Sequence, residues 1–378
     1  MRYYLIAGEA SGDLHGAALI RELALQDSGA RFRFRGGDAM KAASEACGGE
    51  LFRHYAENAV MGIAEVAARA GRILADLRTT GEDVVAWRPD VLILIDYPGF
   101  NLRVAKYAHR HGIKVFWYIA PKLWARGEGR IRKIRKYVDE LFVIFPFEVE
   151  YFSRLGVKAH YYGNPLVDMV GEPQKEGPFP AADGDPRPII ALLPGSRRAE
   201  LKWMMPRLAQ MEMIMKQCAE WSQYRLVIAG VPAFTKEEYA SYLPADSGIE
   251  VRYGDTCDLL REAEAAVVCS GTASLEAALV GTPQVVCYGF NYITYLIARL
   301  TVRIRHISLP NIILGRPAVR ELLQDDCTPS KMLEELDLLA HDDLRRALLK
   351  ADYAELRARM EKPGAASRLA SGMISLLK

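Results

Sequence analysis

The sequence predicts an α/β protein made of two doubly wound, Rossmann-like domains, each built on a parallel β-sheet. Short apolar runs of strand length alternate with segments of helical periodicity in both halves of the chain, and this alternation is typical of parallel strands joined by helical crossovers. In each half, the first apolar run leads into a turn of small residues and then into a helix. Such turns lie at the carboxyl edge of a parallel sheet, where ligands bind.

A segment rich in proline and glycine, at 171–188, separates the two halves and indicates a linker or surface loop. We therefore predict an N-terminal domain at 1–170 and a C-terminal domain at 189–345. At 346–378 we expect helices that could pack back on the N-terminal domain. Because the crossovers are right-handed, we expect the carboxyl edges of the two sheets to face one another across a cleft.

Composition excludes several classes of protein. The chain has 378 residues, of which 50% are hydrophobic and 25% charged, and its formal net charge is +2. These values describe an ordinary globular protein and give no reason to expect nucleic-acid binding. No apolar run reaches 18 residues and no signal-peptide pattern is present, so we expect a cytoplasmic protein without a transmembrane helix. The six cysteines are scattered and no His/Cys cluster has zinc spacing, so we expect reduced thiols and no metal.

The strands of the N-terminal half are predicted from continuous or alternating apolar runs, and the helices from the periodicity between them. We expect strands at 3–7, 31–35, 91–95, 114–118, 141–145 and 158–161, and helices at 14–25, from 57–66 to about 79, at 102–111 and at 148–155. The run 91–95 is apolar throughout, which indicates a strand buried on both faces.

Two polar loops in this half carry candidate functional residues. The first, from Gly8 to Gly16, lacks the GxGxxG spacing of dinucleotide sites. It contains His15, which either packs within the loop or faces a cleft. The second begins at Asp96, directly after the strand 91–95 and before Pro98. Asp96 is either a general base or a turn-forming residue.

A run of cations follows the fourth of these strands and places several positive charges on one helix face. It comprises Arg126, Arg130, Arg132, Lys133, Arg135 and Lys136. A solvated helix face is the ordinary interpretation of such a run. Contact with a phosphate or with an anionic membrane is the alternative, and the sequence leaves both open.

The C-terminal half repeats the pattern of strand, small-residue turn and helix. Strands are expected at 189–193, 226–229, 249–251, 265–269 and 284–287. The turn Gly195-Ser196-Arg197 follows the first of them, and a long helix runs from it to about residue 220. Ser196 could cap that helix, and the side chain of Arg197 could meet a diphosphate.

The turn Ser270-Gly271-Thr272 opens another helix, whose free backbone amides suit a phosphate or diphosphate. Glu276, one turn into that helix, could accept hydrogen bonds from a ribose. Alternatively, Thr272 is a simple N-cap and Glu276 complements the helix dipole. Asn311 lies in an expected loop, where it is available to a ligand. The segment 291–304 is expected to pack in a core or interface, and 329–378 to be helical except at 363–364.

Nine segments resemble, in order and spacing, the lipid-A-disaccharide synthase family. They are AGEASGDLHGA (7–17), MGIAEV (61–66), IDYPGFN (95–101), YIAPKLWA (118–125), FPFE (145–148), GNPLVD (163–168), LLPGSR (192–197), SGTASLEAAL (270–279) and SLPN (308–311). The resemblance covers the chain from about residue 1 to about residue 330. As a set the segments are specific, although each would be weak alone.

The resemblance implies an inverting glycosyltransferase of GT-B architecture that acts in the lipid A biosynthesis of Gram-negative bacteria and needs neither metal nor cofactor. It implies transfer of 2,3-diacylglucosamine from UDP-2,3-diacylglucosamine to the 6-hydroxyl of 2,3-diacylglucosamine 1-phosphate. The products are the β-1,6 disaccharide and UDP. It also implies an enzyme bound peripherally to the cytoplasmic face of the inner membrane, where apolar residues at 61–66 and nearby cations could touch lipid. A homodimer is a further candidate assembly.

On this hypothesis the C-terminal domain binds UDP and the N-terminal domain binds the acceptor. The UDP contacts are assigned to Gly195, Ser196, Arg197, Gly271, Thr272, Ala273, Ser274, Glu276 and Asn311. The acceptor side is assigned to Gly8, Glu9, Ser11, Gly12, Asp13 and Asn101. Asp96 or His15 supplies the catalytic base, with Asp96 favoured, and Arg197 stabilises the leaving group.

Three positions depart from the usual pattern of the family. Gly99 stands where an aspartate is common, Arg126 where a tryptophan is usual, and Asn164 where a histidine is common. These departures bear on acceptor contacts more than on the reaction class. A UDP-sugar 2-epimerase of the same architecture and a non-catalytic sugar-nucleotide-binding protein are the alternative functions.

Overall fold

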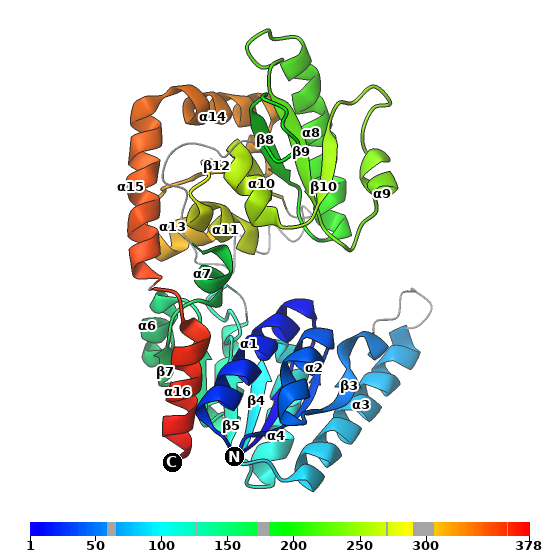
Figure 1. The fold of residues 1–378 in the computed structure, drawn as a ribbon, viewed down its shortest axis with the longest axis vertical. Coiled ribbons are helices and arrows are strands. Elements are labelled where there is room, and N and C mark those ends of the chain that lie inside the picture. Colours follow the sequence, from blue (N-terminus) through cyan, green and yellow to red (C-terminus); the bar gives the residue numbers. More distant parts are fainter. Residues whose placement is uncertain (59–65, 126, 172–180, 270, 290–305, 361) are drawn as a thin grey trace. The chain divides into compact units, whose positions relative to one another are not determined.

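The computed structural model describes residues 1–58, 66–125, 127–171, 181–269, 271–289, 306–360 and 362–378. The chain divides into two compact units, Met1–Asp168 with Lys362–Lys378, and Met169–Glu361 (Figure 1). The segment predicted as 346–378 is therefore divided between them, because its first part belongs to the second unit. The predicted segments 61–65 and 291–304, and Arg126, lie outside the described residues.

The first unit is built on a seven-stranded sheet in the order β3-β2-β1-β4-β5-β6-β7, and every neighbouring pair is parallel. Its strands are β1 Arg2–Ile6, β2 Arg31–Gly36, β3 Glu50–His54, β4 Val91–Ile95, β5 Val115–Tyr118, β6 Glu140–Val143 and β7 Ala159–Tyr161. The chain starts in the middle of the sheet and builds outward in both directions, which is the doubly wound topology.

Two layers of helices cover this sheet. The helices are α1 Ala10–Gln26, α2 Asp38–Ser44, α3 Val66–Trp87, α4 Pro98–Arg110, α5 Ile131–Tyr137, α6 Pro146–Arg154 and α16 Ala365–Leu377, and α7 Pro165–Val170 follows β7. Alternate residues of β1 enter different cores: Tyr3 and Leu5 pack with α1, α2 and α16, whereas Tyr4 and Ile6 pack with α3 to α6. This alternation is the two-residue period of a strand buried on both faces. The C-terminal helix α16 is thus part of the N-terminal core.

The second unit is built on a six-stranded sheet in the order β10-β9-β8-β11-β12-β13, again with every neighbouring pair parallel. Its strands are β8 Ile189–Leu193, β9 Arg225–Gly230, β10 Glu250–Tyr253, β11 Ala263–Cys269, β12 Gln284–Tyr288 and β13 Arg320–Leu323. Its helices are α8 Arg198–Lys216, α9 Lys236–Ala240, α10 Thr256–Glu262, α11 Thr272–Val280, α13 Leu309–Leu314, α14 Pro329–His341 and α15 Asp343–Arg359. The predicted fold class, two doubly wound parallel-sheet units, is confirmed.

The strands that sequence reasoning missed are β3 and β13, and each lies at an edge of its sheet. Their sequences, ELFRH and RELL, mix charged and apolar residues. An edge strand contacts one neighbour only, so it does not need the continuous apolar run by which central strands are recognised. Among the described residues, no helix combines the length and apolar character needed to cross a bilayer.

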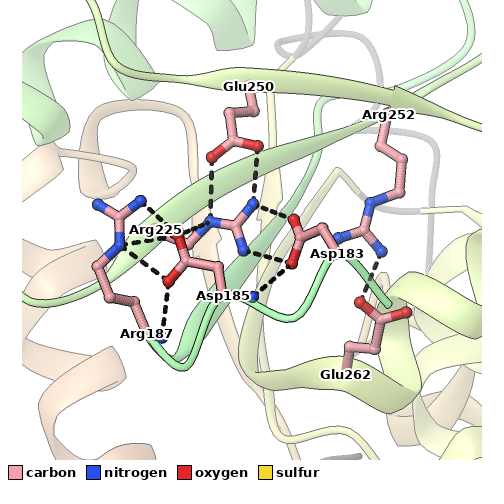
Figure 2. Close-up of polar contacts among 7 residues, drawn as sticks. All are labelled: Asp183, Asp185, Arg187, Arg225, Glu250, Arg252 and Glu262. Carbon is pink, nitrogen blue, oxygen red and sulfur yellow. Dashed lines mark hydrogen bonds and ion pairs between the residues drawn. The ribbon is translucent and has the colours of Figure 1, made fainter. Parts of the chain in front are cut away.

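A buried arginine fastens the chain before β8 to the second sheet (Figure 2). Arg225, at the start of β9, donates through Nε and Nη2 to Glu250, at 3.0 and 2.9 Å, and through Nη1 and Nη2 to Asp183, at 3.0 and 2.5 Å. Its side chain is only 5% exposed. The side-chain bond from Arg225 holds the pKa of Asp183 well below its usual range. The loop at 181–188 is therefore held against the second unit's sheet.

Candidate functional site

Each sheet has one topological switch point, where the chain leaves neighbouring strands in opposite directions. In the first unit it lies between β1 and β4, and in the second between β8 and β11. The loops that open there are the ones singled out in the sequence: Gly8–Glu9 and Asp96–Tyr97 in the first unit, and Gly195–Arg197 and Gly271–Thr272 in the second. Ligands of open α/β sheets bind at such points.

The turn after β8 is built around the contact of Gly195 with Glu200. Gly195 has a φ of +107°, and a Cβ there would lie 2.5 Å from Glu200 Oε2 and 2.6 Å from Glu200 Cβ. Glu200 Oε2 accepts hydrogen bonds from the backbone N–H groups of Ser196 and Arg197, at 2.8 and 3.1 Å. Glu200 therefore caps α8, and the expectation that Ser196 would do so is wrong. The backbone amides of this turn are already occupied by a carboxylate.

The Arg197 side chain remains available at this switch point. It is 77% exposed and pairs with Glu200 Oε1 at 3.0 Å. Burial raises the pKa of the Cys269 thiol, at the end of β11, to about 12, and the charge of Arg197 opposes that rise. Arg197 thus lies within electrostatic reach of the end of β11, directly before the second turn.

Among the residues that the structure describes, no side chain caps the N-terminus of α11. Gly271 is its N-cap residue and Thr272 is its first helical residue, so the alternative in which Thr272 caps the helix is wrong. Ser274 is buried, and its Oγ donates to Gly271 O at 2.8 Å. Gly271 and Thr272 are exposed and Ala273 is half-buried. An uncapped helix N-terminus presents unpaired N–H groups at the positive end of the helix dipole.

Glu276 lies one turn further along α11. Its Oε1 accepts from Cys257 Sγ at 3.2 Å, and burial raises the pKa of Glu276. Cys257 directly follows Tyr253–Thr256, which line a cavity of about 600 Å³ together with Gly230 at the end of β9. A cavity of this size suits a nucleoside-sized ligand.

Asn311 does not lie in a loop. It is a buried residue of α13, and its side chain makes four hydrogen bonds within the fold. Nδ2 donates to Val319 O at 2.9 Å and Glu321 Oε1 at 2.8 Å, and Oδ1 accepts from the N–H groups of Ala318 and Val319. Asn311 also belongs to the lining of a cavity of about 430 Å³, and its assignment to the UDP contacts stays a prediction.

In the first unit, Asp96 lies at a strained bend between β4 and α4. Asp96 and Tyr97 have φ values of +44° and +46°. Residues other than glycine seldom adopt such values, and those that do are found most often at functional sites. Asn101 holds the bend, because its Nδ2 donates to the carbonyls of Ile95 and Asp96 at 3.2 and 2.7 Å. Asn101 is fully buried, so it positions Asp96 and does not line the acceptor side as expected.

Burial raises the pKa of Asp96, the charge of Glu9 raises it further, and the charge of Lys122 opposes both. Gly8 lies against the ring of Tyr97, so closely that a Cβ would be 2.3 Å from it. The loops after β1 and β4 are therefore in contact at the switch point.

Glu9 is the N-cap residue of α1, and the other residues predicted near β1 lie in that helix, which begins at Ala10 rather than at 14. Asp13 is buried, and its carboxylate accepts from the N–H groups of Gly37, Ala39 and Met40 at 2.6, 2.9 and 3.2 Å. Asp13 thus holds the start of α2, which contradicts its assignment to the acceptor side. Gly12 is buried as well, whereas Glu9 and Ser11 are exposed. His15 is half-buried with its ring 6.4 Å from that of Tyr118, and burial lowers its pKa.

Sequence reasoning assigned no role to Lys122 and Glu148, which lie at the same edge. Glu148 is buried and accepts from Trp124 Nε1 at 2.9 Å and Phe145 N at 3.1 Å. Burial raises the pKa of Glu148 to about 7, although these bonds oppose the rise. Lys122 lies in the segment 118–125 and Glu148 in the segment 145–148, both of which carry the family resemblance. Their place in these segments was the signal by which the sequence could have indicated a functional role.

Two of the departures from the family pattern have structural explanations. Asn164 is buried, donates to Ile144 O and accepts from Leu166 N, each at 2.8 Å. It therefore holds the start of α7. Gly99 is exposed in the first turn of α4, with open space around it.

Comparison with known proteins points to one family. Residues 3–372 match the family model described as Lipid-A-disaccharide synthetase. Lipid-A-disaccharide synthases of Syntrophus aciditrophicus and Geobacter metallireducens are each 36% identical to the chain; the alignments cover 99% and 100% of this chain and 97% of each relative.

Solved structures with the same fold are more distant in sequence. A putative UDP-N-acetylglucosamine 2-epimerase from Listeria monocytogenes has a TM-score of 0.66 at 15% identity, covering 99% of this chain and 96% of its own. The glycosyltransferase of kitacinnamycin has a TM-score of 0.62 at 18% identity, covering 100% and 99%. At these identities the likeness concerns the fold, which is that of GT-B glycosyltransferases and epimerases.

Proposed function

The chain belongs to the lipid-A-disaccharide synthase family and is therefore a glycosyltransferase, and we propose that it joins two acylated glucosamines with inversion at the anomeric carbon. The donor is UDP-2,3-diacylglucosamine and the acceptor is 2,3-diacylglucosamine 1-phosphate. The second unit binds the UDP part of the donor, and the first unit binds the acceptor. The observation that carries this proposal is the uncapped N-terminus of α11 beside the exposed Arg197, since such a pair suits a diphosphate.

The leaving diphosphate gains negative charge as the glycosidic bond breaks. The free N–H groups at the start of α11 and the guanidinium of Arg197 stabilise that charge without a metal. Because Glu200 already occupies the amides of Ser196 and Arg197, the β8 turn contributes mainly through the Arg197 side chain. The nucleoside lies towards Glu276 and the cavity at Tyr253–Thr256.

Asp96 removes the proton from the acceptor's 6-hydroxyl. Its raised pKa makes it a stronger base than an ordinary aspartate, while the strained bend and Asn101 fix its orientation. His15, neutral because burial lowers its pKa, lines the acceptor side.

The acyl chains place the enzyme at the inner membrane surface. α3 exposes Ile73 and Leu74, the latter 61% exposed. The contacting helices α4 and α5 expose Arg103, Lys106, Arg110, Arg132, Lys133 and Lys136. Apolar side chains with cations suit an anionic bilayer. Sedimentation with phosphatidylglycerol vesicles tests this: we expect binding that weakens with salt, and no binding would contradict it.

Mass spectrometry of the products tests the reaction. The wild-type protein should form a disaccharide 1-phosphate from the diacyl donor and acceptor. Because 2-epimerisation leaves the mass unchanged, incubation with UDP-N-acetylglucosamine alone is followed by proton NMR, and this sugar should keep its configuration, since only an epimerase acts without an acceptor. Asp96→Ala and Arg197→Ala should each lose about 10²–10³ in rate. Asp38→Ala, at a side chain 94% exposed, serves as the folded control. Near wild-type turnover in both variants would refute the assignment.

A further inference from the structure

We propose that Lys122 binds the anomeric phosphate of the acceptor, so that it determines the enzyme's preference for a phosphorylated acceptor sugar. The inference rests on the proposed function and names a subsite of the same acceptor site. Lys122 lies in the loop after β5, next to the bend that carries Asp96.

The topology brings Lys122 to the acceptor edge. β4, β5 and β6 are neighbours, so Asp96, Lys122 and Glu148 follow the carboxyl ends of three adjacent strands. Asp96 N donates to Tyr118 O, the last residue of β5, at 3.0 Å. Directly beyond it, Ile119 has a φ of +60°. This second strained residue redirects the chain into the loop that carries Lys122.

The ammonium of Lys122 is exposed, and it lies 5.9 Å from the centre of the Phe145 ring. Phe145 stacks in turn on Phe147, at 5.6 Å between ring centroids. The face of the Phe145 ring attracts the ammonium, and this contact leaves the N–H donors of the lysine open to a ligand. No ion pair to Lys122 is formed among the described residues, so its charge is available to a ligand.

The surrounding charge explains why a phosphate needs this lysine. Glu9, Asp96 and Glu148 each bring a carboxyl group to this edge, and the charge of Lys122 lowers the pKa of both Asp96 and Glu148. A phosphate dianion brought to the same edge would be repelled by the ionised carboxylates. Lys122 is the cation that acts on both, and an ammonium is a common phosphate ligand.

The chemistry of the acceptor fits this arrangement. Its 6-hydroxyl is on C6, the exocyclic carbon attached to C5, and its phosphate is on C1; C5 and C1 flank the ring oxygen. A base for the hydroxyl and a cation for the phosphate must therefore lie within about one sugar ring of each other. Asp96 and Lys122, on adjacent strand ends, meet that requirement.

The test compares two acceptors, 2,3-diacylglucosamine 1-phosphate and its dephosphorylated form, with wild-type protein, Lys122→Gln and Lys122→Arg. We expect Lys122→Gln to raise the KM for the phosphorylated acceptor by about 10- to 100-fold, because a charge-assisted hydrogen bond is lost. At a pH above the range in which Asp96 titrates, the KM for the donor, and the values for the dephosphorylated acceptor, should stay the same. Lys122→Arg should restore most of the preference. Lys158→Gln, an exposed lysine before β7, is the matched control.

Binding of the phosphorylated acceptor, measured by calorimetry without donor, separates this inference from the reaction itself. If the wild-type protein binds it more tightly than Lys122→Gln does, the phosphate subsite stands even where no disaccharide forms. Equal binding by both proteins, or an unchanged preference for the phosphorylated acceptor in Lys122→Gln, would overturn the inference.

Discussion

Substituting Gly195 by alanine should destabilise the turn after β8 through two separate effects. The first is conformational, because a φ of +107° costs a residue with a Cβ about 1–2 kcal/mol. The second is steric, because the new Cβ would lie 2.5 Å from Glu200 Oε2. Glu200 must then move and leave the amides of Ser196 and Arg197, and the loss of a helix cap costs about 0.5–2 kcal/mol. Together these effects amount to about 1.5–4 kcal/mol.

Gly315→Ala isolates the conformational effect. Gly315 also belongs to the second unit and has a φ of +75°, but no atom lies within 4 Å of an added Cβ. Its substitution should therefore cost only about 1–2 kcal/mol. We expect thermal unfolding at a lower temperature for Gly195→Ala than for Gly315→Ala.

Hydrogen exchange on peptides that cover 195–204 adds a local measurement. In Gly195→Ala, the amides of Ser196 and Arg197 should exchange faster than in the wild-type protein, and UDP should bind more weakly because Arg197 shifts with the turn. In Gly315→Ala neither property should change. Equal melting temperatures for the two variants, with wild-type protection of both amides, would refute the capping role of Glu200.

Three further predictions concern titration and capping in the first unit. Burial raises the pKa of Asp96, so kcat/KM should fall as the pH decreases, with a midpoint above the pKa of an ordinary aspartate. Lys122→Gln removes a positive charge that lowers the pKa of Asp96, so it should move this midpoint to higher pH. A midpoint at the ordinary pKa of aspartate would contradict the assignment of Asp96 as the base. Glu148 has a pKa of about 7 against 4.5 in the unfolded chain, so the folded state binds more protons between these values. Stability should fall by roughly 3 kcal/mol as pH rises from 4.5 to above 7, and Glu148→Gln should flatten that dependence in denaturant unfolding. Asp13→Ala should lower the free energy of unfolding by about 3 kcal/mol, since three N–H groups at the start of α2 lose a carboxylate; a loss below 1 kcal/mol would show that solvent replaces it.

The central strands were predictable from the sequence because burial on both faces leaves a direct trace there. The runs 91–95 and 189–193 are apolar throughout and coincide with β4 and β8. The edge strands β3 and β13 left no such trace. The start of α1 was misplaced because Ser11, Gly12 and Asp13 have the composition of a loop, whereas Asp13 is used inside the helix to hold α2.

The location of the candidate site was predictable, but the task of each side chain was not. Small-residue turns after the first strand of each half predicted ligand-binding loops at the carboxyl edges of the sheets, and in the structure these turns lie at the switch points. Whether Glu200 or Ser196 caps α8, and whether Asn311 meets a ligand or the chain at 318–321, depends on which distant backbone groups the fold brings near. The spacing of residues in the sequence does not show which distant backbone groups a polar side chain will meet. The sequence therefore predicted a ligand contact for short polar side chains near a turn.

The position of α16 limits how the protein can be cut into pieces. A fragment that stops at the linker would lack Leu369, Ala370 and Met373, which are fully or almost fully buried against the sheet. The apolar side chains of the sheet and of α1 that α16 covers would be exposed to solvent, so the fragment should aggregate on expression. Asp168 accepts hydrogen bonds from the N–H groups of Gly364 and Ala365, at 2.6 and 3.1 Å, so the two ends of the N-terminal unit are already adjacent. A protein in which a few glycines replace residues 169–361, and so join residue 168 to residue 362, should yield that unit as a soluble, continuous polypeptide.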